Sequence, residues 1–99
     1  LNGVELISAE IPETFSLSQN YPNPFNPVTN VKFSIPKTGN VKLAVYDITG
    51  KEVMILLNGN LSAGTYNTDL DASKLASGVY FYRLETEEYQ NVKKMILVK

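Results

Sequence analysis

Val31-Lys32-Phe33-Ser34-Ile35 is the stretch that decides the fold, because its apolar and polar residues alternate strictly. A period of two places successive side chains on opposite faces of a β-strand. The turn residues Pro36-Lys37-Thr38-Gly39-Asn40 follow, and the alternation resumes along Val41-Lys42-Leu43-Ala44-Val45. Proline, glycine and asparagine favour turns, so the sequence predicts two strands joined by a turn.

The remainder of the chain repeats this pattern. It predicts strands at residues 52–57, 66–71, 79–86 and 92–98, and one around 15–20, with Asn58-Gly59-Asn60 ending the first of these. No long segment has a helical period. The predicted fold is therefore all-β, a seven-stranded antiparallel immunoglobulin-like β-sandwich. Tyr80, at the start of a strand, is expected to form a tyrosine corner by bonding to backbone a few residues upstream.

Composition removes most classes of function. The chain has 99 residues, 9 Lys+Arg and 10 Asp+Glu, with neither histidine nor cysteine. These counts exclude a Ser-His-Asp triad, a cysteine nucleophile and a zinc site built from nitrogen and sulfur. The net charge of −1 offers no attraction for nucleic acid or an anionic membrane surface. The longest apolar run, residues 53–57, is too short to cross a bilayer. We expect no enzyme, no cofactor and no membrane insertion.

Charge and proline are unevenly distributed along the chain. Residues 1–30 contain no Lys or Arg and four of the five prolines. We interpret residues 1–13 as a linker or appended strand from a larger protein, and residues 14–99 as the sandwich domain. The chain begins with Leu1 and has no signal-peptide pattern, so we expect it to be a piece of a longer polypeptide.

The proline-rich stretch Tyr21-Pro22-Asn23-Pro24-Phe25-Asn26-Pro27 is the least ordinary feature of the sequence. Its prolines fix φ and exclude a helix. A ligand of the PxxP type is one interpretation, but asparagine at alternate positions suits tight turns better. We expect a rigid lead-in whose Tyr21 and Phe25 plug the open end of the sandwich.

Three aspartates, Asp47, Asp69 and Asp71, are candidates for catalysis, for cation binding or for closing turns. Asp69 and Asp71 share one face of a strand, as a pair of catalytic carboxylates would, but short turns leave little room for a cleft. With Asp47 they could also bind a hard cation such as calcium. The favoured interpretation is that Asp47 and Asp71 close turns through bonds to backbone N–H groups, so no metal site is expected.

Five blocks follow one another in a fixed order along residues 12–99. They are Leu17-Ser18-Gln19-Asn20-Tyr21-Pro22-Asn23-Pro24-Phe25-Asn26-Pro27-Val28-Thr29, Val41-Lys42-Leu43-Ala44-Val45-Tyr46-Asp47-Ile48-Thr49-Gly50-Lys51-Glu52-Val53, Ala63-Gly64-Thr65-Tyr66, Ser77-Gly78-Val79-Tyr80-Phe81-Tyr82-Arg83-Leu84 and Lys93-Lys94-Met95-Ile96-Leu97-Val98-Lys99. Together they resemble the type A C-terminal sorting domains of type IX secretion cargo. Immunoglobulin-like domains of flagellar hook-capping proteins share the Tyr-Asp-x-x-Gly and Gly-x-Tyr blocks.

The resemblance assigns a structural role to the proline-rich motif, residues 21–27, and to Asp47, Gly50, Gly64, Gly78 and Tyr80. The chain departs from the family at one place, because Leu70 precedes Asp71 where a tryptophan is common. This change affects a core contact and not the terminal block.

The resemblance implies a non-catalytic domain that directs a larger passenger through the type IX translocon of the outer membrane. A sortase-like surface protease then removes the domain, and the passenger is secreted or attached to the cell surface after transit through the periplasm. The sorting signal is implied to be the last strand, Lys93, Lys94, Met95, Ile96, Leu97, Val98 and Lys99. A receptor would bind its apolar side chains and pair its ammonium groups. If this strand forms a sheet edge, it also invites strand addition or a weak homodimer.

Two alternatives remain open. One is a carbohydrate-binding or adhesive module of a secreted hydrolase, in which a row of exposed tyrosines would stack on sugar rings. The other is a structural stalk or hook-cap-like domain, which would form a stable oligomer.

Overall fold

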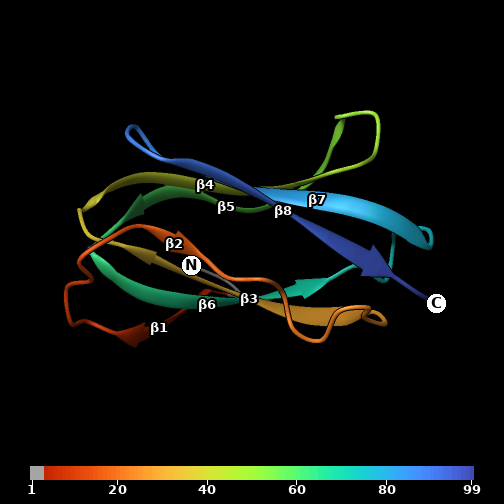
Figure 1. The fold of residues 1–99 in the computed structure, drawn as a ribbon, viewed down its shortest axis with the longest axis horizontal. Coiled ribbons are helices and arrows are strands. Elements are labelled where there is room, and N and C mark those ends of the chain that lie inside the picture. The colour runs from red at the N-terminus through yellow and green to blue at the C-terminus, as the bar shows by residue number, and fades with distance from the viewer. Residues whose placement is uncertain (1–3) are drawn as a thin grey trace.

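The computed structural model describes residues 4–99, which form two antiparallel sheets stacked as a sandwich (Figure 1). The strands are β1 (Val4–Ser8), β2 (Ser16–Leu17), β3 (Val28–Ile35), β4 (Gly39–Tyr46), β5 (Glu52–Leu61), β6 (Gly64–Asp71), β7 (Gly78–Glu85) and β8 (Gln90–Leu97). The first sheet has the order β1-β6-β3-β2 and the second has the order β5-β4-β7-β8. The predicted β-sandwich is confirmed, with eight strands in place of seven.

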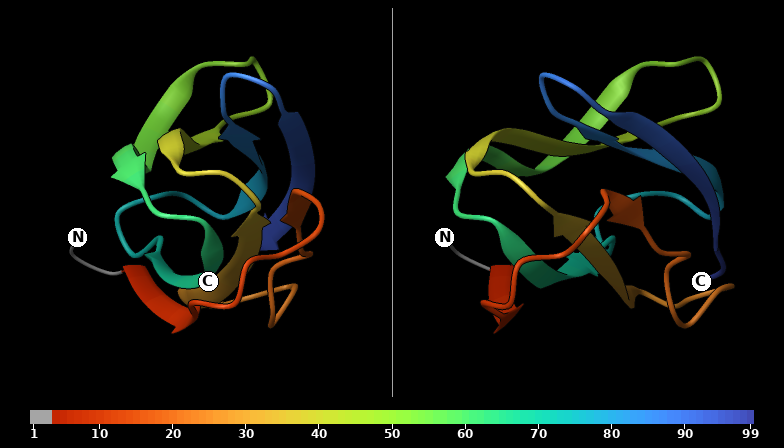
Figure 2. Two further views of the ribbon diagram at one scale, coloured as in Figure 1. Left: turned by 90° about the vertical axis from the view of Figure 1, so that its left-hand side faces the viewer. Right: turned by 60° about the vertical axis from the view of Figure 1, so that its left-hand side comes forward.

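The alternating stretches of the sequence build the core. Val31, Phe33 and Ile35 on β3 face Val41, Leu43 and Val45 on β4, and each is at most 2% exposed. The turn between these strands carries the chain from one sheet to the other (Figure 2), because β3 pairs with β6 whereas β4 pairs with β5 and β7. The two strands therefore meet through side chains and not through backbone hydrogen bonds.

Strand β5 is longer than predicted. Asn58-Gly59-Asn60 was expected to end it, and this prediction is wrong: Asn58 pairs with Lys42 and Asn60 with Asn40 along β4. Backbone pairing across a regular neighbour outweighs the turn preference of these residues. The strand expected around residues 15–20 is shorter than predicted and is reduced to Ser16–Leu17.

Two tyrosine corners fasten the sandwich. The Tyr80 hydroxyl donates to the carbonyl of Ala76 at 2.7 Å, as predicted. The Tyr66 hydroxyl donates to the carbonyl of Ser62 at 2.7 Å in the same way. Both tyrosines lie two residues after a glycine, so the Gly-x-Tyr spacing was the signal for the second corner.

Asp47 and Asp71 close turns, as the sequence indicated. Asp47 Oδ1 accepts from the Thr49 hydroxyl at 2.6 Å and from the N–H groups of Thr49 and Lys51. These bonds, led by the Thr49 hydroxyl, hold the pKa of Asp47 below its usual value. Gly50 completes this turn with a φ of 86°, which side-chain-bearing residues rarely adopt. Asp71 Oδ1 accepts from the N–H of Ser73 at 3.0 Å, and this bond lowers the pKa of Asp71.

Replacing Gly64 with alanine is expected to destabilise the fold. A Cβ at Gly64 would lie 2.8 Å from the backbone oxygen of Ser8, so β1 must shift. We expect a loss of about 1–3 kcal/mol in the free energy of unfolding, measured by urea denaturation. Gly39→Ala is the control, since no atom lies within 4 Å of the added Cβ and its stability should be unchanged or higher. Equal stability of the two variants would contradict the close approach.

Candidate functional site

Strand β8 forms an edge of the second sheet and pairs with β7 alone among the strands. Its side chains alternate between two environments. Met95 and Leu97 are 0% and 1% exposed in the core, whereas Lys94 and Val98 are exposed. A receptor was expected to bind the apolar side chains of the terminal block. In the folded domain Met95 and Leu97 are not available to it, because they are not on the surface. Lys93 and Ile96 are half-buried and Lys99 is exposed.

The outer backbone edge of β8 is covered by residues 19–25, which we call the capping segment. Gln19 Nε2 donates to the carbonyl of Lys94 at 2.6 Å, and the N–H of Ile96 donates to Asn23 Oδ1 at 3.0 Å. The N–H of Phe25 then donates to the carbonyl of Ile96 at 3.0 Å, and the N–H of Val98 to the carbonyl of Phe25 at 2.9 Å. The proline-rich block and the terminal block, which are far apart in sequence, form one continuous structure.

Phe25 and Tyr21 have opposite roles within the capping segment. Phe25 is 2% exposed and belongs to the core, so the expected plug is confirmed for this residue. For Tyr21 the prediction is wrong, since its side chain is 81% exposed. The backbone of Tyr21 exchanges two 3.0 Å hydrogen bonds with Asn30. Tyr21 is thus held by its backbone, and its ring is left in solvent.

A cluster of buried polar side chains, Asn20 and Thr29, holds the capping segment through hydrogen bonds to its backbone. Asn20 is 2% exposed and donates from Nδ2 to the carbonyl of Pro22 and to Thr29 Oγ1, both at 3.1 Å. Thr29 Oγ1 in turn donates to the same Pro22 carbonyl at 2.8 Å. The peptide bonds before Pro22, Pro24 and Pro27 are cis. Asparagine and threonine side chains thus pair backbone groups that no strand reaches.

Tyr82 ties this cluster to the second sheet. Its side chain is fully buried, and its hydroxyl donates to the carbonyl of Ser18 and accepts from the N–H of Asn20, both at 2.7 Å. Burial raises the pKa of Tyr82 to about 12, because the charged phenolate would lose its hydration. Sequence reasoning did not single out Tyr82, and the only signal for it was its place in a predicted strand two residues after Tyr80.

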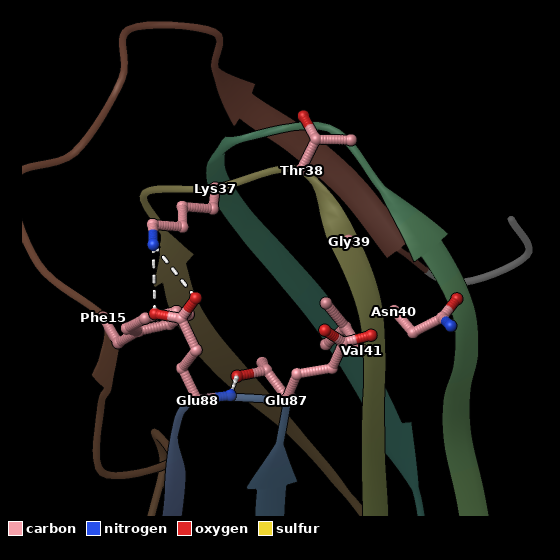
Figure 3. Close-up of a pocket in the computed structure, with 9 residues that line it drawn as sticks. Phe15, Lys37, Thr38, Gly39, Asn40, Val41, Glu87 and Glu88 are labelled. Atoms are coloured by element: carbon pink, nitrogen blue, oxygen red, sulfur yellow. Dashed lines mark hydrogen bonds and ion pairs between the residues drawn. The ribbon is translucent and has the colours of Figure 1, made fainter.

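The opposite end of the sandwich has a small hollow lined by Phe15, Lys37, Val41 and Glu88 (Figure 3). Lys37 Nζ lies 2.9 Å from Glu88 Oε1, and the ring of Phe15 stacks on Tyr89 with centroids 4.9 Å apart. The Lys37–Glu88 pair joins the β3–β4 turn to the β7–β8 turn, and the Phe15–Tyr89 stack joins the N-terminal segment to the same turn.

Other candidate chemistries find little support in residues 4–99. No group of three metal-binding side chains occurs within them. Among the tyrosines of this part of the chain only Tyr21 is exposed, so the row of aromatics expected of a sugar-binding face does not form. No helix that could span a bilayer occurs among the described residues.

An all-β module whose last strand is a sheet edge, held by a dedicated capping segment, is the class of protein that this fold and site define. The chain belongs to the secretion system C-terminal sorting domain family, whose model matches residues 19–99. The match begins at the first residue of the capping segment and confirms the resemblance found in the sequence. The domain is thus a C-terminal sorting signal for type IX secretion, from a family that is not catalytic. A comparison with curated proteins gave no match.

Phe25→Ala is expected to loosen the capping segment and lower the free energy of unfolding by about 3–5 kcal/mol, because it empties a core position. Tyr21→Ala, four residues earlier, should lower the free energy of unfolding by less than about 0.5 kcal/mol, because the Tyr21 ring is in solvent. Thermal or urea denaturation measures both. Similar losses in the two variants would contradict their assignment to core and surface.

The stability of the domain should depend on Tyr82 at high pH. The pKa of about 12 in the folded domain lies above the ordinary value of 10.0, so the unfolded chain loses its proton first as pH rises. Below pH 10 the Tyr82 phenol makes its full contribution to the free energy of unfolding, and this contribution is lost as pH rises toward 12. Tyr82→Phe should be less stable by about 1–3 kcal/mol at neutral pH, owing to the two bonds it removes. The difference in free energy of unfolding between Tyr82→Phe and the wild type should narrow above pH 10. A difference that stays constant with pH would contradict the raised pKa of Tyr82.

Proposed function

We propose that the type IX machinery recognises one composite surface, made by the exposed side chains of the last strand and of the capping segment. The supporting observation is the set of hydrogen bonds that joins Gln19, Asn23 and Phe25 to the outer edge of β8. Through these bonds the exposed residues Lys94 and Val98 lie beside the exposed turn of Tyr21, Pro22 and Pro24.

On this proposal the terminal block, residues 93–99, divides into two roles. Met95 and Leu97 anchor the strand in the core. Lys94, Ile96 and Val98 face outward and provide the contacts. Lys99 holds the end of the chain in place, because its N–H donates to Ser77 Oγ at 3.0 Å and its Nζ donates to the carbonyl of Ser73. Lys93, half-buried beside the core, contributes its charge at the rim.

Recognition by side chains is favoured over strand addition to β8. An added strand needs free N–H and C=O groups along the edge, and from residue 94 to residue 98 the capping segment already uses them. A partner strand would first have to displace Phe25 from the core. Self-association through an edge strand would instead use β1, β2 or β5, whose outer edges pair with no other strand of residues 4–99.

The sorting signal implies export to the exterior or the cell surface. We propose in addition that residues 1–13, whose strand β1 is appended to the edge of the first sheet, connect the passenger to the sandwich domain of residues 14–99. A sortase-like surface protease would then remove the domain after translocation and leave the passenger released or anchored at the cell surface.

Reversing the charge of Lys94 tests the composite surface. A reporter fused in front of the 99-residue chain is expressed in a bacterium with a type IX system, and the exported fraction is measured. Lys94→Glu should lower export roughly tenfold, equivalent to about 1.4 kcal/mol of binding. Lys32→Glu is the matched control: this lysine is also exposed, on the outer face of the first sheet, and its reversal should leave export unchanged. Both variants should keep the thermal midpoint of the wild type. Normal export of Lys94→Glu would overturn the proposal.

A further inference from the structure

The two outer faces of the sandwich differ in character. On the first sheet the outward side chains are polar, and they include Asn30, Lys32 and Asp69. On the second sheet charged and polar side chains alternate with a group of apolar ones: Ile55, Val79, Phe81, Val92 and Ile96, with Ile48 beside them in the β4–β5 turn. We call this set the apolar face. An antiparallel sheet normally presents polar residues to water, so the second sheet needs an explanation.

Strand register makes the apolar face continuous. Ile55, Ala44, Arg83 and Val92 are direct cross-strand neighbours on four successive strands. Ala44 is fully buried at the centre of this row although it points outward, because its larger neighbours cover it. The next row contains Tyr46, Phe81 and Lys94, and beside it Val79 pairs with Ile96. Direct and diagonal neighbours touch on the same face, so the apolar residues of β7 and β8 group around Phe81, with the charged Arg83 and Lys94 among them.

Several members of the apolar face are left in water. Ile48 is 74% exposed, Ile55 50%, Val92 47% and Val79 36%. A shallow hollow lies between the β4–β5 turn and β7, lined by Tyr46, Ile48, Phe81 and Val92 together with the charged Asp47 and Arg83. Contiguous exposed apolar surface of this kind marks interaction sites, whereas isolated exposed apolar residues are common.

The charges at the rim identify the kind of partner. Lys42 is already paired with Glu52 at 2.7 Å, and Arg83 Nη2 donates to the Tyr46 hydroxyl at 2.8 Å. Lys94 has no acidic group within 4.0 Å among the described residues. The rim beside β8 is therefore positive. In a two-fold contact a second copy would bring the same lysine opposite, and its carboxylates on this face, Glu52 and Glu85, already lie beside Lys42 and Arg83. Carboxylates on a different protein therefore fit Lys94 better.

We infer that the apolar face of the second sheet is a docking surface for a protein of the secretion machinery that presents apolar side chains bordered by carboxylates. The inference rests on the proposed function and extends it. The recognised surface continues from Lys94 and Ile96 on the last strand across β7 and β4 to Ile55 on β5. Sorting information is thus distributed over the whole sheet and not confined to the terminal block.

The test replaces exposed apolar residues without changing charge. Val92→Asn and Ile55→Asn are combined in the 99-residue chain behind the export reporter. Val28→Asn is the matched control, because Val28 is 43% exposed on the outer face of the first sheet. Lys94→Glu is measured alongside to report on the proposed function. The double variant should lower export roughly tenfold, and the control should export as the wild type does. Thermal midpoints confirm that all variants fold.

The outcomes separate the inference from the proposed function. If Lys94→Glu blocks export and the double variant does not, the apolar face is no docking surface, while the terminal signal stands. If the purified wild-type chain sediments as a dimer and the double variant as a monomer, a second copy covers the face and the inference is overturned. Co-sedimentation of the wild type, but not of the double variant, with phosphatidylglycerol vesicles would assign the face to lipid and overturn it equally.

Discussion

The hydrogen bonds between the capping segment and the outer edge of β8 are the constraint on which the rest of the structure depends. A strand at the edge of a sheet has a row of unpaired N–H and C=O groups, and a strand at the end of a chain frays easily. Here Gln19, Asn23 and Phe25 supply partners along residues 94–98. They close the edge and hold the strand against β7, so its outward side chains have fixed positions.

The composition of the capping segment follows from this task. Proline has no N–H, so the exposed Pro22 and Pro24 leave fewer donors without partners while their fixed φ stiffens the path. The side chain of Asn23 replaces a backbone acceptor that the irregular path does not present to Ile96. Phe25 supplies the apolar burial that keeps the segment in place. The buried Tyr82 hydroxyl pairs the backbone at Ser18 and Asn20, where the segment begins.

Much of the fold is predictable because local pattern and tertiary environment agree. The alternation in residues 31–35 and 41–45 places the correct side chains inward, and the Gly-x-Tyr spacing predicts the corner at Tyr80. Prediction from the sequence fails where a residue far away in the sequence determines the local conformation or burial. Asn58-Gly59-Asn60 has the composition of a turn, but pairing with β4 makes it a strand. Tyr21 and Phe25 are equivalent aromatics in the sequence, and they differ only because Asn30 holds the backbone of Tyr21 and Ile96 holds that of Phe25. The edge cap joins residues more than seventy positions apart, and no periodicity reports such a contact.

On the proposed function, the alternation of a strand also couples the recognised surface to the fold. Met95 and Leu97 face the core while Lys94 and Ile96 face outward, and a slip of one residue would exchange the two sets. The core therefore fixes the register in which the outward residues are displayed. On the proposed function, a truncation of the last strand removes the recognised surface and part of the core together, whereas a substitution at an outward position changes the recognised surface alone. A surface that exists only when β8 is docked and capped would then be displayed by the folded domain alone.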